Sequence, residues 1–155
     1  MSVTFESIRF GTVEVAAEDT VEFPLGLIGL GGLRYALMDR NPGTGFLWLH
    51  SMEDPALALP VVPPQLFFED FGLELSEDDA ERTGLSDLSA ASVYVTVRAT
   101  PDPLDITANL RAPLVILAGR GYQVINLNDN ALLQAPLFTV ADHSAAEQAH
   151  TSDAA

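Results

Sequence analysis

Short apolar segments recur along most of this sequence, and turn-forming residues separate them. In SVYVTVRAT, residues 92–100, Val93, Val95 and Val97 alternate with more polar residues. Alternation with a period of two is typical of a strand with one buried face. Further segments of strand character lie at 3–15, 20–23, 34–40, 46–52, 56–62, 113–118 and 122–127. Strands at this spacing predict a mainly β protein, a single small antiparallel barrel-like domain or a sandwich.

Glycine and proline mark the connections between these segments. Gly11 lies at the expected turn of the first hairpin, NPGTG at 41–45 separates two strands, and GRG at 119–121 joins the last two. The glycine-rich segment 25–33 is predicted to be a loop. Pro60 falls inside an apolar strand segment, and because proline cannot donate to a ladder it predicts an edge strand or a bulge.

One short acidic helix is predicted in the middle of the chain. In LSEDDAERTGL, residues 75–85, Ser76 is a candidate N-cap, acidic residues follow it, and Gly84 is a candidate C-cap. We interpret its carboxylates as partners of the helix dipole. The length of 155 residues indicates one domain, which we place at 1–138. Residues 139–155 have few large apolar side chains and predict a disordered acidic tail.

The charge balance limits the partners of this chain. Asp and Glu total 22, Lys and Arg total 7, and the formal net charge is −15. Such a chain repels phosphate backbones, so direct nucleic-acid binding is not expected, whereas a basic protein partner would be attracted. Solubility alone or a halophilic origin would also explain the charge. No apolar run is long enough to cross a bilayer and no secretory signal is visible, so we expect a cytoplasmic protein.

Few residues suggest catalysis. His50, Glu53 and Asp54 could form a small hydrolase site, but a lone histidine at a strand end and an EDP turn are commonly structural. Segment 25–33 lacks the third glycine of a dinucleotide loop, and a chain without lysine has no P-loop. The absence of cysteine excludes disulfides and thiolate metal sites. We predict no enzyme, cofactor or metal; a small β-barrel that carries a ligand remains an alternative.

The segment TANLRAP precedes the most apolar strand of the chain. Pro113 lacks an N–H and suits the first residue of a strand. Thr107 and Asn109 have short polar side chains that can bond to nearby backbone groups in a turn. That is a structural interpretation of the segment. In a functional interpretation, which can hold together with the first, the turn leaves Leu110 and Arg111 at the surface, as an apolar anchor and a set of donors for a partner.

Five segments together resemble the flagellar assembly factor FliW family, in the order that this family has. They are FPLGL at 23–27, FLWLHSMEDPALAL at 46–59, VYVTV at 93–97, TANLRAPLVI at 107–116 and GYQVINL at 121–127. The resemblance covers roughly residues 3–138. The family more often has glutamine at the position of His50.

The resemblance implies a small barrel-like binding protein. FliW proteins bind the RNA-binding translational repressor CsrA and relieve the repression of flagellin synthesis, and flagellin competes for FliW in a chaperone-like partner switch. We therefore expect a cytosolic monomer with CsrA and flagellin as its partners. The candidate partner-binding residues are Glu53, Asp54, Pro55, Thr107, Asn109, Leu110, Arg111 and Pro113.

Overall fold

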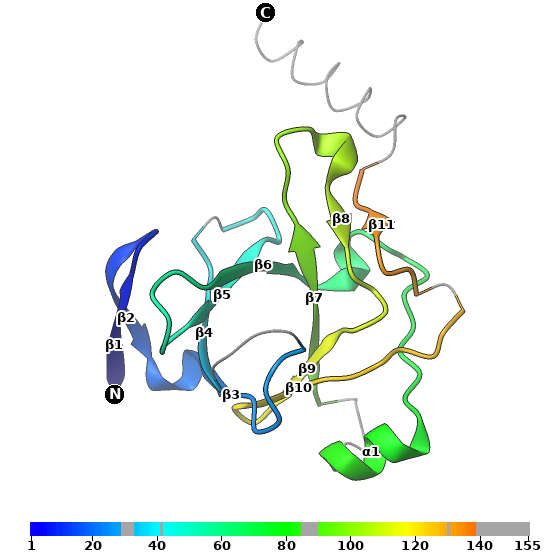
Figure 1. The fold of residues 1–155 in the computed structure, drawn as a ribbon, viewed down its shortest axis with the longest axis horizontal. Coiled ribbons are helices and arrows are strands. Elements are labelled where there is room, and N and C mark those ends of the chain that lie inside the picture. Colours follow the sequence, from blue (N-terminus) through cyan, green and yellow to red (C-terminus); the bar gives the residue numbers. More distant parts are fainter. Residues whose placement is uncertain (29–32, 41, 85–89, 130, 139–155) are drawn as a thin grey trace, which may run out of the picture.

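A closed β-barrel forms the centre of the computed structural model, which describes residues 1–28, 33–40, 42–84, 90–129 and 131–138 (Figure 1). Within these residues, seven strands close the barrel. They are β3 (Thr20–Glu22), β4 (Arg34–Met38), β5 (Leu47–Ser51), β6 (Ala58–Val62), β7 (Ser92–Arg98), β9 (Leu114–Leu117) and β10 (Arg120–Gln123). The mainly β, barrel-like fold predicted from the sequence is confirmed.

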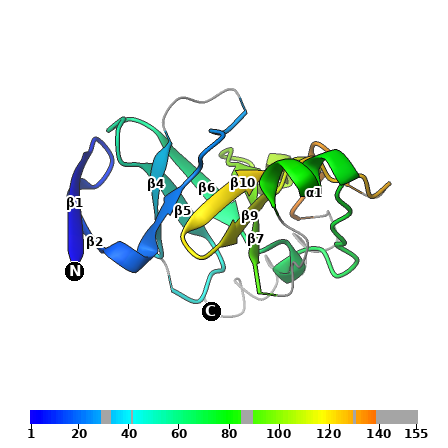
Figure 2. The ribbon, with the colours of Figure 1, turned by 90° about the horizontal axis from the view of Figure 1, so that it is seen from below.

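Further elements surround the barrel. They are the hairpin β1 (Ser2–Ser7) and β2 (Gly11–Ala16), helix α1 (Glu77–Thr83), the short strands β8 (Thr107–Ala108) and β11 (Ala135–Pro136), and 3-10 turns at Ala17–Asp19, Pro64–Leu66 and Pro103–Asp105. Both ribbon views place the hairpin at one end of the molecule and α1 at the other (Figures 1 and 2).

The barrel closes because β7 has different neighbours along its length. Its first half pairs with β9, its middle with β6 and its last residues with β8. Among the strands that the structure describes, all pairs are antiparallel except β10 and β3, which meet in parallel at Arg120 and Glu22. The expected antiparallel barrel is therefore confirmed, except for this one parallel pair.

Large apolar side chains fill the barrel interior. The buried residues of this interior cluster are Val21, Phe23, Leu27, Tyr35, Leu49, Val61 and Leu114. The rings of Phe23 and Tyr35 pack edge to face, with centroids 5.5 Å apart. A Cβ atom on Gly121 would overlap the ring of Phe23, so only glycine fits at that point of β10.

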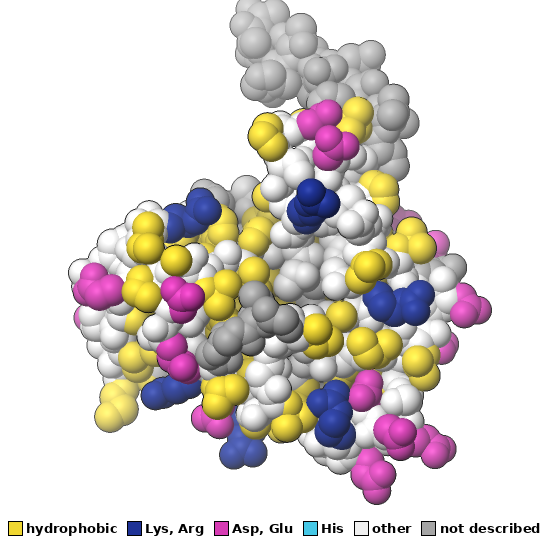
Figure 3. Space-filling model, viewed as in Figure 1, with side chains coloured by type: hydrophobic (Ala, Val, Ile, Leu, Met, Phe, Trp, Pro, Cys, Tyr) yellow, Lys and Arg dark blue, Asp and Glu magenta, His cyan; other side chains and the backbone are white. Residues whose placement is uncertain are grey.

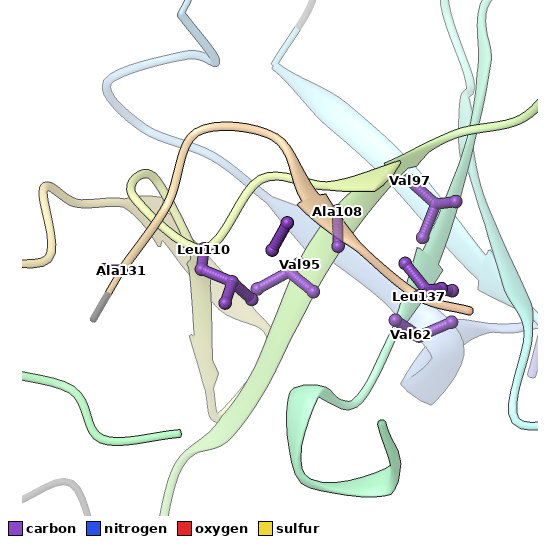
Figure 4. Packing of buried hydrophobic residues seen from close by; sticks show 8 residues of the cluster. Val62, Val95, Val97, Ala108, Leu110, Ala131 and Leu137 are labelled. Carbon is purple, nitrogen blue, oxygen red and sulfur yellow. The ribbon is translucent and has the colours of Figure 1, made fainter. Parts of the chain in front are cut away.

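The outer faces of the barrel are covered as well. The β1–β2 hairpin packs Phe5 and Val13 against Ala36 and Met38 of β4. A second outer cluster joins β6 and β7 to the C-terminal segment 131–138, and Figure 4 shows its side chains between these elements. Because strands of this barrel have apolar neighbours on both faces, PLVIL reads as a continuous apolar run rather than an alternating one.

Most local predictions are confirmed. Gly11 has a positive φ at the turn of the first hairpin, and the Ser76 Oγ accepts the Asp79 N–H at 3.0 Å as the helix N-cap. Gly84 ends the helix in the left-handed region with φ 73°. The Asp79 carboxylate also accepts the Ile125 N–H at 3.2 Å, which ties the helix to the segment after β10.

Two details differ from the sequence-based expectation. The last hairpin turns at Ala118 and Gly119 instead of GRG, so β10 begins at Arg120. Pro60 lies in an interior strand, β6, not at an edge. Its place is tolerated because Pro60 pairs with Trp48 on one side only, and the pairing of β6 with β7 begins at the next residue.

Two expectations lie outside the described residues. They concern the tail at 139–155 and most of the glycine-rich stretch, 29–32. In the part of the chain that is described, no helix is long and apolar enough to span a bilayer, and no cluster of acidic and histidine side chains could hold a metal ion.

Candidate partner-binding surface

The TANLRAP segment forms a built turn beside the barrel. Thr107 begins the short strand β8, which lies between β7 and β11. The Asn109 Oδ1 accepts the N–H groups of Arg111, at 3.0 Å, and Ala112, at 3.1 Å. Asn109 therefore shapes the turn through nearby backbone groups, as its residue type predicted.

Leu110 is not at the surface, and that expectation is wrong. Its side chain is 5% exposed and lies in the outer cluster with Val95 and Ala131 (Figure 4). Its N–H donates to the Leu132 carbonyl at 2.9 Å. The C-terminal segment covers this side of β7, and that long-range contact turns an apparent surface leucine into a core residue.

The neighbours of Leu110 differ in their exposure. Pro113 is buried, and its carbonyl accepts the Val124 N–H at 3.1 Å. Arg111 is exposed, as expected, and its Nε donates to the Ala131 carbonyl at 2.9 Å. This bond fixes the direction of the guanidinium group of an exposed residue.

Glu53, Asp54 and Pro55 form an exposed turn after β5. The Glu53 Oε1 accepts the N–H groups of Leu33 and Arg34, both at 3.0 Å. These two bonds hold the pKa of the Glu53 carboxyl below its ordinary value. The Asp54 Oδ1 accepts the Ala56 N–H at 2.9 Å, which is an Asx-type turn.

His50 is fully buried and does not join these carboxylates. Its Nδ1 lies 2.7 Å from the Ser51 carbonyl oxygen, and its Nε2 lies 2.7 Å from the Ser7 Oγ. Both ring nitrogens are therefore engaged in structural bonds, while Glu53 and Asp54 bond to backbone N–H groups. This arrangement does not support a hydrolase site built on these three residues.

A groove of about 580 Å³ opens beside the TANLRAP turn. Its lining residues are Leu27, Ile28, Leu59, Thr96, Val97, Arg98, Thr107, Asn109, Arg111, Ala112, Leu114, Gln123, Ile125, Leu133 and Gln134. Three of the predicted site residues therefore lie together here, whereas the turn at 53–55 is not part of the lining. On the face of the molecule that Figure 3 shows, hydrophobic side chains gather across the middle and most acidic side chains lie toward the edges.

Gln123 joins two of the segments that carry the family resemblance. Its Oε1 accepts the Ile28 N–H at 2.7 Å, and its Nε2 donates to the Ala112 carbonyl at 3.1 Å. Ile28, directly after FPLGL, is thus held against the TANLRAP turn at the edge of the groove. In the sequence, Gln123 is recognisable only as a polar residue inside an apolar strand, and this gives no indication of its role as a bridge.

Asn126 was also missed, and it is fully buried. Its Oδ1 accepts the N–H groups of Glu74 and Asn128, each at 3.0 Å. Its Nδ2 donates to the carbonyls of Gly72, at 2.9 Å, and Leu110, at 3.3 Å. One amide side chain therefore ties three segments together behind the turn, which is a structural role.

Comparison with known proteins identifies the family to which this barrel belongs. The model of the FliW protein family matches residues 4–143. The chain belongs to the FliW family. The flagellar assembly factor FliW of Bdellovibrio bacteriovorus is 37% identical over 134 residues, which are 84% of this chain and 77% of that protein.

Other FliW proteins are similar over comparable spans. The flagellar assembly factor FliW of Leptospira biflexa is 31% identical over 134 residues, covering 84% of this chain and 88% of the relative. A crystal structure of the flagellar assembly factor FliW superposes with a TM-score of 0.76 and 28% identity, covering 88% of this chain and 98% of that one. The barrel is thus the FliW fold.

Proposed function

We propose that this FliW-family chain is a flagellar assembly factor that works in the cytosol by binding proteins rather than by catalysis. It binds a CsrA-type translational repressor, relieves the repression of flagellin synthesis, and releases the repressor when flagellin binds. The observation that carries the proposal is the family match over residues 4–143, together with relatives named as flagellar assembly factors.

The electrostatics of the chain support a basic partner. The net charge is −15, and α1 alone begins with Glu77, Asp78 and Asp79. A protein that holds RNA is basic where it contacts phosphates, so opposite charges speed its encounter with this chain. Once bound, the acidic chain also raises the free energy of bringing phosphates close to the repressor, which opposes RNA binding without covering the RNA site.

A titration at two ionic strengths tests this proposal. The purified chain is mixed with the CsrA encoded in the same genome, and association and dissociation rates are measured at low and at high salt. Screening should lower the association rate markedly, because charges separated by more than about 10 Å lose their attraction at roughly 0.1 M salt. Absence of binding to both CsrA and flagellin would contradict the proposal.

The partner switch has its own test. If flagellin displaces the repressor, each partner must weaken the binding of the other by the same factor. CsrA affinity is therefore measured with and without saturating flagellin, and flagellin affinity with and without saturating CsrA. A stable ternary complex with affinities equal to those of the two binary complexes would contradict competition while leaving each binding event intact.

A further inference from the structure

The groove beside the TANLRAP turn differs in charge from the rest of the molecule. None of the described residues that line it is acidic, although the chain contains 22 Asp and Glu residues. Two of the seven arginines, Arg98 and Arg111, line it. A strongly acidic protein therefore presents a groove of apolar and cationic character.

Both groove arginines are available to an anionic partner. Arg98 is exposed at the end of β7, and Arg111 is exposed with its Nε held by the Ala131 carbonyl. Among the described residues the one ion pair within 4.0 Å joins Arg82 to Asp79, so neither groove arginine has an ion-pair partner there. A guanidinium fixed in direction loses less freedom when it binds a carboxylate, which it can do through two N–H groups.

Apolar side chains continue from the groove onto its rim. Ile28 is 65% exposed, Leu133 is 63% exposed and Ile125 is 40% exposed. The backbone of the two isoleucines is held in place, because the Ile28 N–H donates to Gln123 and the Ile125 N–H donates to Asp79. Exposed apolar surface that extends beyond a groove indicates contact with a macromolecule rather than enclosure of a small ligand.

We propose that this groove docks an amphipathic helix of a protein partner, one whose apolar stripe is flanked by carboxylates. Helices of this kind lay their apolar face into a groove and use flanking charges for orientation. The carboxylates complement Arg98 and Arg111. The groove therefore selects an acidic helix, whereas the overall negative charge of the chain attracts a basic partner. The inference rests on the proposed function, because it takes a protein as the occupant. It assigns a binding surface that is chemically distinct from the acidic surface that attracts a basic partner.

The C-terminal tail of the same chain is a poor occupant. Residues 139–155 contain acidic side chains, but Val140 is their one apolar residue larger than alanine. A helix needs apolar anchors at several positions along one face to fill such a groove. The tail therefore lacks an apolar stripe that could pack on the exposed Leu133, Ile28 and Ile125 of the rim.

Two synthetic helical peptides test the chemistry. They share one length and one stripe of leucine and alanine, and the flanking positions carry glutamate in one and lysine in the other. Fluorescence anisotropy with the full chain at physiological salt, where long-range repulsion is screened, gives the dissociation constants. We expect Leu133→Asp to weaken binding of the glutamate peptide about tenfold or more. Arg98→Gln should weaken it about threefold to tenfold.

Matched controls separate the groove from the general surface. Ile8→Asp changes a side chain that is 77% exposed on the hairpin, and Arg120→Gln changes an exposed arginine outside the groove. Both should bind the glutamate peptide like the unmodified chain. Binding of the lysine peptide, which the acidic surface attracts, should not respond to Leu133→Asp.

Three results would overturn the proposal. The first is an affinity for the glutamate peptide that neither Leu133→Asp nor Arg98→Gln changes. The second is an equal loss for the two peptides in Leu133→Asp, which would show that carboxylates are irrelevant. The third is a concentration-dependent dimer that Leu133→Asp dissociates, which would make a second copy of the chain the occupant.

The same variants separate this inference from the proposed function. If the unmodified chain binds CsrA or flagellin but Leu133→Asp and Arg98→Gln bind the glutamate peptide as well as the unmodified chain does, the groove assignment fails and the function stands. If the unmodified chain binds neither CsrA nor flagellin but binds the glutamate peptide in the groove, the function fails and the groove chemistry stands. Thermal unfolding of every variant confirms that each compared protein is folded.

Discussion

The Nε2 of His50 lies 2.7 Å from the Oγ of Ser7, and this contact fastens the amino-terminal hairpin to the barrel. The tautomer follows from the other ring nitrogen. Because the Ser51 carbonyl can only accept, Nδ1 carries a proton, and in the neutral imidazole Nε2 then accepts the hydroxyl hydrogen of Ser7. The Ser7 oxygen also accepts the Phe10 N–H at 3.0 Å, so one serine organises the hairpin turn and its docking.

Ser7→Ala should lower the free energy of unfolding by about 1–3 kcal/mol, because it leaves the buried Nε2 of His50 without a donor. Urea unfolding followed by tryptophan fluorescence measures the change, since Trp48 packs in the cluster under the hairpin. Ser2→Ala, at an exposed position of the same strand, is the matched control. Equal midpoints for the two variants would show that the buried hydrogen bond contributes nothing.

Leu110→Ala should destabilise the fold by about 2–5 kcal/mol, the usual range for a buried leucine. A surface position of Leu110 would instead predict a loss of partner binding with little effect on stability. Arg111→Ala is the neighbouring comparison, because its exposed side chain contributes one hydrogen bond to Ala131. If Leu110→Ala melted like the unmodified chain, its place in the outer cluster would be wrong.

Asn109→Ala should destabilise the chain by about 1–3 kcal/mol, because the N–H groups of Arg111 and Ala112 lose their acceptor. Asn109→Asp keeps an acceptor oxygen at the same position and should retain more stability. Thermal unfolding of both variants, with partner titration alongside, gives the comparison. An Asn109→Ala variant that melts normally but no longer binds a partner would make the asparagine a direct contact.

Local features of this fold could be predicted, and long-range ones could not. The Ser76 cap, the Gly11 turn and the alternation in β7 depend on residues close in sequence, and the structure has all three. The burial of Leu110 depends on the C-terminal segment about twenty residues away. Periodicity reports which side chains share a face, but it does not report whether another segment covers that face.

The groove could not be predicted from the sequence for the same reason. It combines the loop at Leu27, the end of β7, the TANLRAP turn and the segment near Leu133. The family resemblance pointed to the turn, but the role of Gln123 as a bridge between Ile28 and Ala112 appears only when distant segments meet. The acidic composition likewise gives no indication of a groove whose described lining residues include two arginines and no carboxylate.

Ala118→Asn should stabilise the chain by about 0.5–1 kcal/mol. Ala118 and Gly119 have φ values of 53° and 80° in the two-residue turn of the β9–β10 hairpin. A left-handed conformation costs an alanine about 1–2 kcal/mol, whereas Asn-Gly is favoured in such turns. Ala118→Ser, which adds a polar group without that preference, is the control, and thermal unfolding is the measurement. A gain in Ala118→Ser as large as in Ala118→Asn would contradict the backbone explanation.

Glu53→Gln should make the stability of the chain depend less on pH in the acid range. The N–H groups of Leu33 and Arg34 hold the pKa of the Glu53 carboxyl below its ordinary value of 4.5. A carboxyl whose pKa is lower in the folded state contributes stability above its unfolded pKa, and that contribution is lost as the pH falls through the folded pKa. Glu53→Gln should therefore unfold at lower urea than the unmodified chain at pH 7, and the difference should narrow as the pH falls below 4.5.

The same substitution has a second readout at high pH. Burial raises the pKa of the Tyr35 phenol above 10.0, and the charges of Glu53 and Asp54 raise it further. Removing the Glu53 charge should lower the pKa of Tyr35. In an alkaline titration, the absorbance of its tyrosinate should then appear at a lower pH than in the unmodified chain. Glu14→Gln, at an exposed position of β2, is the control for both measurements and should change neither curve. A urea difference between Glu53→Gln and the unmodified chain that stays constant from pH 7 to pH 3 would mean that the carboxylate charge does not act through these two N–H groups.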